Sequence, residues 1–498
     1  MNRHTRRQAS TDPAAEQAAG AGAGAVRWSS VPRRGVAKPG RGWVGAWPAV
    51  PAWRMTSDQA PVLWPFVTAP PLPAGGALLG WDLASGGLFH ADPVGWVLDP
   101  KIPVANPNVF VFGKPGRGKS ATVKAMVLRL VDCGYQALIL GDAKDEYTPL
   151  CRALGVEPVE IGPGLPGRIN PLDYAPGTDT GTDAGTGHSS DRRSWDATVA
   201  RWTGLVGSLV GSIRQAHQRV PFGPTENTVV SHVLRDLTGS HSGATHPAPV
   251  TIPLLWQALA DPTRDLVQAC RYASVRDFLD QTRLLRDALG QLVSGSLAGL
   301  FDAPSTVRLD PAAPIQSLSL ARLSTAGDDA VGIALLCLGA WGSAHRGLPG
   351  GHRAPRVVVR DEAWKQLRLG VDAVASFDAD LRLSRSTGDI QIAVAHKPSD
   401  LLTAGDTGSQ AVAIARDLLH LADIRVLHGQ DPATADDLDQ LLGLGPTARS
   451  VVTGWAMHGT GRALWCVGPR HHQVQTVLHP DERHLTDTNT ALDPRTGP

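Results

Sequence analysis

One segment constrains the fold of this 498-residue chain more than any other: residues 113–120, which read GKPGRGKS and match the spacing G-x-x-x-x-G-K-[ST]. The apolar run at 108–112 precedes this segment and predicts a buried strand. Apolar residues recur at helical spacing over 121–131 and predict a helix after it. Strand, glycine loop and helix in this order are the setting in which such a segment forms a phosphate-binding loop. The sequence therefore predicts an α/β fold organised around that loop.

The chemistry of this loop predicts a nucleoside triphosphate, ATP or GTP, as the ligand. Backbone N–H groups of such a loop point at a polyphosphate, and the N-terminus of the following helix adds a favourable dipole. We expect Lys119 to reach the β- and γ-phosphates and the Ser120 hydroxyl to bind Mg²⁺. The predicted nucleotide-binding residues are Gly113, Lys114, Pro115, Gly116, Arg117, Gly118, Lys119, Ser120 and Ala121.

Two adjacent carboxylates follow a second apolar strand, at residues 356–362 (RVVVRDE). We expect this strand end to lie beside the phosphate loop, because the carboxyl ends of parallel strands face the ligand. Asp361 is the predicted Mg²⁺ ligand, and Glu362 is the residue predicted to polarise the attacking water.

A further polar segment, GDAKDEY at 141–147, follows an apolar strand at 137–140. It should lie at the same edge of the sheet. Two interpretations of Asp142, Lys144 and Glu146 are left open. Either they orient metal, phosphate or nucleotide, or they form a polar loop with a helix cap.

Composition and periodicity divide the chain into seven predicted segments. The fold class that they predict is α/β, a RecA-like P-loop NTPase core with an inserted helical domain and a small β-rich N-terminal lead-in. The insertion explains the long separation between residues 119 and 361. Residues 451–457 and 462–467, joined by HGTG, predict a closing β-hairpin. The segments are a flexible tail (1–40), the lead-in (41–105), the first part of the core (106–174), a flexible linker (175–190), the helical domain (191–294), the second part of the core (295–480) and a C-terminal tail (481–498).

Charge and cysteine content exclude several classes of protein. A net charge of +1 gives no global field that would attract nucleic acid or membrane. The five cysteines are scattered without C-x-x-C spacing, so we expect a reducing compartment and no cysteine metal site. No run approaches the roughly 18 apolar residues that span a bilayer, and we expect no secretory signal. Residues 1–60 hold nine Arg or Lys against three Asp or Glu. They either contact anionic lipid or nucleic acid or form a solvated tail.

The order of the motifs resembles the FtsK–HerA superfamily of P-loop motor ATPases, and most closely the TraC/TraG-like ATPases of conjugation and type IV secretion. The resemblance spans residues 60–490. The most specific part is the order of DEAW, R-x-x-R and AHKPSD after the phosphate loop. The matching segments are NPN (106–108), the loop at 113–120, GDAKDEY (141–147), RINPLD (168–173), GSLAGLFD (295–302), VVVRDEAW (357–364), LRLSR (381–385), AVAHKPSD (393–400) and LTD (485–487).

The resemblance implies a homohexameric ring that binds ATP and Mg²⁺ between subunits, with an arginine finger supplied by the neighbouring subunit. Arg385 is the first candidate and Arg382 the second, because a cation at the γ-phosphate offsets transition-state charge. The alternative is that both are ordinary surface residues of an exposed helix. His396 stands where the family usually has a glutamine, and it is the candidate sensor of the γ-phosphate.

The function implied by the resemblance is that of a motor ATPase that energises conjugative transfer or type IV-like secretion. Its partners would be components of a membrane-embedded channel. It would be cytoplasmic, either free or peripheral at the inner face of the cell membrane. The transmembrane helices usual in coupling proteins are missing, which favours the energising type of ATPase. Two alternatives are a soluble DNA translocase of the same fold, which would bind DNA in a salt-sensitive way, and a structural component that binds ATP with negligible turnover.

Overall fold

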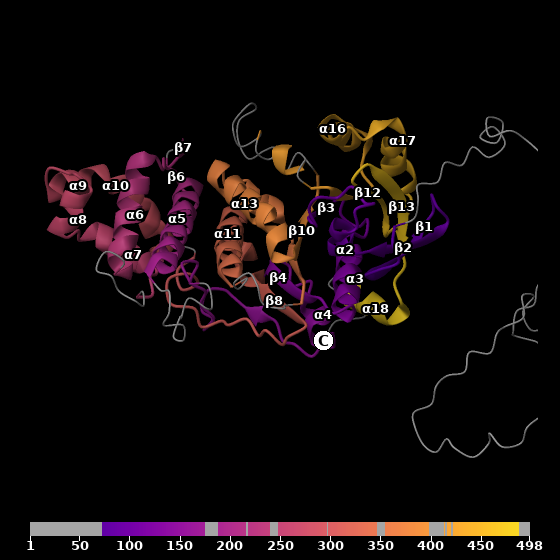
Figure 1. Ribbon diagram of the computed structural model, residues 1–498, viewed down its shortest axis with the longest axis horizontal. Helices are drawn as coiled ribbons and strands as arrows, with labels where there is room; N and C mark the ends of the chain where they lie inside the picture. Colours follow the sequence, from indigo (N-terminus) through magenta and orange to yellow (C-terminus); the bar gives the residue numbers. More distant parts are fainter. Residues whose placement is uncertain are drawn as a thin grey trace, which may run out of the picture. The chain divides into compact units, whose positions relative to one another are not determined.

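The strand predicted before the phosphate loop is β3 (Val109–Phe112), and it lies inside a large sheet (Figure 1). Its side chains alternate, so that Val109 and Val111 join the core on one face while Phe110 and Phe112 join the core on the other. Both faces are therefore covered, as in an α/β fold. The eleven strands of this sheet, in spatial order, are β2 (Gly87–Ala91), β1 (Ala77–Asp82), β13 (Arg470–Thr476), β12 (Arg462–Val467), β11 (Ile424–His428), β3, β10 (Asp389–Ala395), β9 (Arg356–Arg360), β4 (Gln136–Asp142), β8 (Ile315–Ser319) and β5 (Val159–Glu160).

The computed structural model describes most of the chain from Leu72 to Asp487, all of it within a single unit that spans residues 68–498. The predicted tail at 1–40 and most of the predicted linker at 175–190 lie outside the described residues. The ranges described are 72–174, 188–215, 218–239, 248–295, 297–345, 354–397, 413, 416–419 and 422–487.

The strands from β11 through β5 run parallel, and those from β12 to β2 extend the sheet with antiparallel pairs. β3 pairs with β10 on one side and β11 on the other, whereas β9 pairs with β10 and β4. One strand, β10, therefore separates the phosphate loop from the carboxylates that follow β9.

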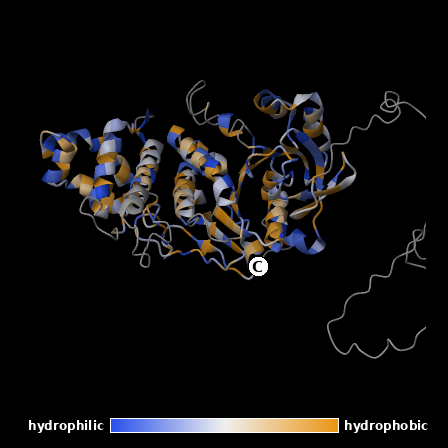
Figure 2. Ribbon diagram, viewed as in Figure 1, coloured by the Kyte–Doolittle hydropathy of each residue, from blue (hydrophilic) through white to orange (hydrophobic). Residues whose placement is uncertain are grey.

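Helices cover both faces of the sheet. On one face α2, α3 and α4 pack on the core that includes Val111 and Ile392. On the other face α12, α13, α16 and α17 surround Phe110, while α11 covers Leu138 and Leu140. Figure 2 shows hydrophobic residues concentrated in the central strands and α11. The bounds are α2 (Pro93–Leu98), α3 (Lys119–Asp132), α4 (Thr148–Ala153), α11 (Asp328–Ala344), α12 (Ala363–Leu367), α13 (Val371–Thr387), α16 (Pro432–Leu442) and α17 (Gly445–Ser450), with a 3₁₀ segment η2 (Ala321–Ala326) before α11.

In the described part of the chain between β5 and β8, six helices lie beside α11 and α13, and α5 packs on both (Figure 1). Trp202, Leu205 and Leu209 of α5 are buried, as their helical spacing predicts. The helical run around 278–285 is divided at Thr282, whose backbone leaves the helical region. The helices are α5 (His188–Ser212), α6 (Pro224–Thr238), α7 (Ile252–Ala260), α8 (Arg264–Ala269), α9 (Val275–Gln281) and α10 (Arg283–Ser294), with a two-stranded ribbon of β6 (Arg214–Gln215) and β7 (Gln218–Arg219).

The hairpin predicted over 451–467 is wrong in its first strand. Residues 451–455 form a π-helical turn, η3 (Val451–Trp455), directly after α17. The buried Val452 packs with α16 and α17, and this tertiary packing overrides the strand preference of valine. The hairpin that does form joins β12 to β13. It turns at Gly468, which has a positive φ of 56° and no room for a Cβ against the Pro103 carbonyl.

Within the described ranges, no helix combines the length and the apolarity that crossing a bilayer requires. The predicted C-terminal tail contains α18 (Pro480–Thr486), which Figure 2 shows as largely hydrophilic. Arg129 of α3 connects α18 to the lead-in, because its guanidinium pairs with Glu482 at 2.5 Å and donates to the carbonyls of Val477 and Leu78. Arg129 therefore links α3, the helix of the phosphate loop, to both β1 and α18.

The lead-in is also fixed by Asp82, a buried carboxylate at the end of β1. It accepts hydrogen bonds from the backbone of Ala84 and Gln473, from Ser85 at 2.7 Å and from His472 at 3.0 Å. Burial alone would raise the pKa of Asp82, but its hydrogen bonds with His472 and Ser85 lower it below the ordinary value of 3.8. The ionised carboxylate therefore joins β1 to β13.

We expect Asp82→Asn to lower the free energy of unfolding by about 1–3 kcal/mol at neutral pH, because an amide cannot satisfy the same four donors. A lowered folded-state pKa stabilises the fold above the unfolded value, and this contribution is lost as the pH falls below 3.8. The difference between wild type and variant in thermal unfolding should therefore shrink in acid. The exposed Asp132→Asn is the control. A difference that is independent of pH would contradict the assignment.

Candidate nucleotide-binding site

The loop between β3 and α3 depends on glycine at particular points. Gly116 and Gly118 have positive φ angles of 76° and 91°, a region that favours glycine. A Cβ on Gly113 would lie 2.5 Å from the Cβ of His428, and one on Gly118 would lie 2.5 Å from the backbone nitrogen of Gly461. Because α3 begins at Lys119, the unpaired N–H groups of its first turn face the same space as the loop. This backbone has the form of an anion cradle.

Segments distant in sequence hold the loop in place. The Gly113 N–H donates to the carbonyl of His396 (3.2 Å), at the end of β10, and the Lys114 N–H donates to that of Gly429 (3.1 Å), after β11. The side chain of Lys114 pairs with Asp431 at 3.1 Å. No sequence pattern pointed to Gly429 or Asp431, since their contribution depends only on which strands neighbour β3.

The other end of the loop is held by the turn before β12. Arg117 donates through Nη1 to the carbonyl of Met457 (2.9 Å), and its own carbonyl accepts from Gly461 (3.1 Å). The guanidinium of Arg117 is therefore engaged within the protein. Close packing at Gly118 and Gly461 explains why this HGTG segment contains glycines without forming the predicted hairpin turn.

Lys119 is buried at the start of α3, and its ammonium lies over the loop. Nζ donates to the Gly113 carbonyl at 2.5 Å and lies 3.3 Å from His396 Nδ1. Burial lowers the pKa of Lys119 to about 8, although the nearby carboxylates of Asp361 and Glu362 oppose the shift. A desolvated ammonium beside a backbone cradle suits a polyphosphate, whose charge would replace the lost hydration.

Asp361 and Glu362 follow β9 and are both buried. Burial raises the pKa of Asp361 to about 7, and the carboxylates of Glu362 and Glu146 add to the shift. A buried acid among other acids is stabilised by a divalent cation, so the residues fit Mg²⁺. Across the described ranges no group of three or more His, Cys, Asp or Glu is arranged to hold a metal. Magnesium would therefore depend on Ser120, Asp361, phosphate oxygens and water.

His396 connects Lys119 to Glu362 across β10. Its Nδ1 accepts from Lys119, because an ammonium can only donate, so Nε2 must carry the ring proton. Nε2 lies 3.5 Å from Oε2 of Glu362. The predicted sensor therefore stands between the phosphate loop and the predicted base.

Glu362 has further partners and an unusual backbone. Trp364 donates to Oε2 and Lys144 pairs with Oε1. Burial by itself would raise the pKa of Glu362, but hydrogen bonds from His396 and Lys144 hold it well below its usual range. Its φ of 56° lies in the left-handed region, which is costly for a residue with a side chain. No sequence pattern predicts the contact of Trp364 with this acid.

The polar residues of 141–147 differ in what they contact: Asp142 shapes the loop, as the polar-loop interpretation expects, while Lys144 contacts Glu362. Asp142 is buried and accepts the backbone N–H groups of Lys144 (3.3 Å), Glu146 (3.0 Å) and Tyr147 (2.7 Å), so it shapes the loop. Glu146 lies 3.9 Å from Lys124 of α3. Only Lys144 reaches the predicted catalytic acid.

The two arginine candidates lie away from these contacts, exposed on α13. Arg382 pairs with Asp378 of the same helix at 2.7 Å. Arg385 lies in the last turn, before Gly388 ends the helix in a left-handed conformation. Their exposure fits either a surface role or contact with another subunit.

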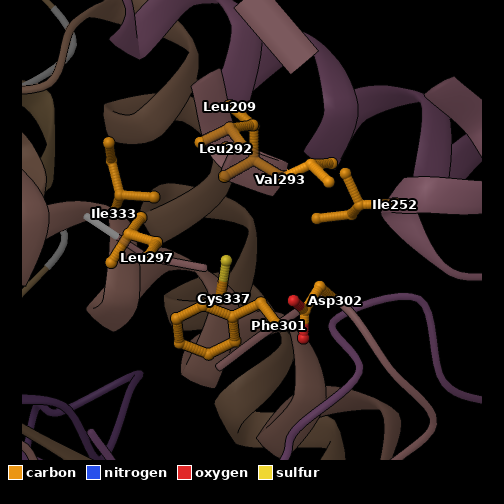
Figure 3. A pocket seen from close by; sticks show the side chains of 9 residues that line it. All are labelled: Leu209, Ile252, Leu292, Val293, Leu297, Phe301, Asp302, Ile333 and Cys337. Atoms are coloured by element: carbon orange, nitrogen blue, oxygen red, sulfur yellow. The ribbon is translucent and has the colours of Figure 1, made fainter. Parts of the chain in front are cut away.

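A small cavity lies between α5, α7, α10 and α11 (Figure 3). Apart from Asp302, its lining is apolar or a buried cysteine. Asp302 is engaged elsewhere, since it accepts from the Gly299 N–H (2.8 Å) and lies 3.8 Å from Arg168. The cavity therefore offers no chemistry comparable to that of the loop. The lining residues are Leu209, Ile252, Leu292, Val293, Leu297, Phe301, Asp302, Ile333 and Cys337.

Solved structures resemble this fold over most of its length. VirB4 of Thermoanaerobacter pseudethanolicus matches with a TM-score of 0.61 and 18% identity, covering 83% of this chain and 100% of that chain. The bacterial conjugative coupling protein TrwBdeltaN70, in its unbound form, matches with a TM-score of 0.53 and 13% identity, covering 82% and 91%. TrwB in complex with ADP and Mg²⁺ matches with a TM-score of 0.53 and 14% identity, covering 82% of this chain and 91% of that chain.

Neither a protein-family model nor a curated protein matches this sequence. The structural likeness, the parallel sheet and the glycine loop between β3 and α3 agree on the architecture. The chain therefore has a P-loop NTPase fold that resembles those of VirB4 and TrwB.

Proposed function

We propose that this protein is a motor ATPase that energises conjugative transfer or type IV-like secretion. The observation that supports the proposal is the line of contacts from Lys119 through His396 to Glu362, the proposed base, which is buried next to the Mg²⁺ candidate Asp361. The fold is shared with VirB4 and with TrwB, and TrwB has been solved with ADP and Mg²⁺. In this proposal residues 106–174 and 295–480 form the motor core and residues 191–294 the inserted domain.

The residues have distinct roles in the proposed reaction. The N–H groups of the loop and of the first turn of α3 bind the phosphates, and Lys119 stabilises charge on the β- and γ-phosphate oxygens. Ser120 and Asp361 hold Mg²⁺, which neutralises phosphate charge when it is bound. Glu362 orients the attacking water and accepts its proton. His396 contacts both Lys119 and Glu362, so a movement of Lys119 toward a phosphate would change the hydrogen bonding of Glu362.

Assembly is part of the proposal, because no arginine of α13 reaches the loop of its own chain. We propose a homohexamer in which Arg385, with Arg382 as the alternative, contacts the nucleotide of the neighbouring subunit. The proposed partners are components of a membrane-embedded channel, and the proposed location is cytoplasmic or peripheral at the inner face of the membrane. DNA is the alternative cargo.

We expect Arg385→Ala to lower turnover by a factor on the order of 10³ while nucleotide affinity is largely kept, since the cation acts mainly in the transition state. Mixing Arg385→Ala with Lys119→Ala subunits should restore some activity. Some interfaces then combine an intact loop with an intact finger. If mixed oligomers form and remain inactive, Arg385 does not act across the interface, and Arg382 becomes the candidate.

The experiment that tests the function measures ATP turnover with and without DNA, together with the mass of the assembly with nucleotide. A secretion motor should hydrolyse ATP and form a nucleotide-dependent oligomer without depending on DNA. Turnover that rises strongly with DNA, in a salt-sensitive way, would favour the translocase. Nucleotide binding with negligible turnover would favour the structural component.

A further inference from the structure

An ion pair outside the phosphate loop engages the carboxylate that the proposed reaction needs. Lys144 Nζ pairs with Oε1 of Glu362 and so joins the 141–147 loop to the end of β9. The side chain of Lys144 is 50% exposed, whereas that of Glu362 is 6% exposed. Lys144 can therefore leave the pair for solvent or another anion at a much smaller desolvation cost than Glu362 would incur.

Both oxygens of Glu362 are occupied by what we call the donor cage, Lys144, Trp364 and His396. Lys144 takes Oε1, while Trp364 Nε1 and His396 Nε2 face Oε2. A carboxylate held by three donors, one of them a cation, is a weaker acceptor for a proton from water. The arrangement described here is thus poorly suited to hydrolysis.

The 141–147 loop presents Lys144 from a fixed turn. Asp142 is buried at the end of β4 and accepts three backbone N–H groups of this loop, including that of Lys144 itself. The turn is therefore held in place, while the long side chain of Lys144 keeps its freedom. A change of partner requires rotation of this side chain and no refolding of the loop.

Lys144 is connected to the phosphate loop through Glu362 and His396. His396 contacts both Lys119 of the loop and Oε2 of Glu362, while Lys144 pairs with Oε1 of the same carboxylate. A γ-phosphate bound by Lys119 would bring negative charge to this line of contacts and attract the exposed Lys144. Nucleotide therefore competes with Glu362 for Lys144.

We propose that Lys144 is a positioning residue that holds Glu362 in the donor cage until the γ-phosphate draws Lys144 away and frees the carboxylate. The inference rests on the proposed function, since it requires a triphosphate in the loop. It separates binding from hydrolysis, because the base becomes available only after the nucleotide has arrived.

The test is a double-mutant cycle of Lys144→Met and Glu362→Gln, followed by thermal unfolding of the full chain. Without nucleotide, the double variant should lose less in Tm than the sum of the single losses, because either change breaks the same pair. With a non-hydrolysable ATP analogue bound, the losses should become additive. Lys144→Gln serves as a second neutral variant if the Met variant does not fold, and the exposed Lys101→Met is the matched control.

Turnover provides the second readout. Lys144→Met should raise KM several-fold, because the variant lacks the cation that the γ-phosphate attracts, and Lys144→Arg should return KM toward the wild-type value. Two outcomes would overturn the inference while leaving the ATPase proposal intact. One is that the losses in Tm stay non-additive with the analogue bound, and the other is that kcat falls in Lys144→Met. If the analogue does not raise the Tm of the wild-type protein, the proposed function fails and the inference fails with it.

Discussion

Lys119→Ala should weaken nucleotide binding by a factor of roughly 10–100 and abolish nearly all turnover. The substitution removes a buried ammonium whose pKa is lowered to about 8 by burial. Among the described residues, its hydrogen-bond partners are the Gly113 carbonyl and His396. A hydrogen bond to a charged group contributes about 1.5–3 kcal/mol, which corresponds to that loss of affinity. Titration with a fluorescent ATP analogue and an assay of phosphate release measure the two effects.

The fold should survive this change. Lys119 makes no ion pair within 4 Å among the residues described, so alanine breaks no buried salt bridge. Thermal unfolding without nucleotide should therefore stay close to wild type, and Lys101→Ala, at an exposed site, provides the matched control. Turnover at the wild-type rate in folded Lys119→Ala would refute the assignment of the loop.

Glu362→Gln should keep nucleotide affinity and slow hydrolysis by a factor of about 10²–10⁴, the usual contribution of a positioned general base. The amide preserves the shape of the side chain and removes the proton acceptor. The protein should therefore accumulate with ATP bound and stay in its nucleotide-bound assembly. Single-turnover phosphate release and the mass of the assembly in ATP measure these two consequences.

An exposed glutamate gives the control for this prediction. Glu157 pairs with Arg152 on the surface, so Glu157→Gln should turn over ATP like the wild type. If Glu362→Gln also hydrolysed ATP at the wild-type rate, Glu362 would not be the base. The acid next to it, Asp361, would then be the candidate, because its pKa of about 7 is nearer to the pH of the reaction.

Residue spacing was sufficient to predict secondary structure where the residues of a short segment favour one conformation. Strand, loop and helix at 109–132 follow the prediction, because the glycines permit positive φ and the apolar spacing changes from strand to helix. The strand that ends at Arg360 was also predicted, since a continuous valine run suits a sheet covered on both faces.

Residue spacing did not predict the secondary structure of segments whose conformation depends on contacts with distant parts of the chain. Val451 and Val452 have strand-like side chains, yet burial among α16 and α17 makes them part of a π-helical turn. The strand at 470–476 was missed because its polar and apolar residues alternate weakly, and it is fixed by pairing with both β12 and β1. In both cases pairing and packing partners far away in the chain determine the outcome.

The sequence alone determined which groups the proposed chemistry uses: a glycine loop, a lysine and two carboxylates at a strand end, because glycine spacing and strand polarity are local properties. Tertiary structure decided what those groups contact. Only the strand order places His396 between Lys119 and Glu362, and only the turn held by Asp142 brings Lys144 to the same carboxylate. The contacts of Lys119 with His396 and of Lys144 with Glu362 each join residues more than 200 positions apart, and their geometry depends on which strands become neighbours in the sheet.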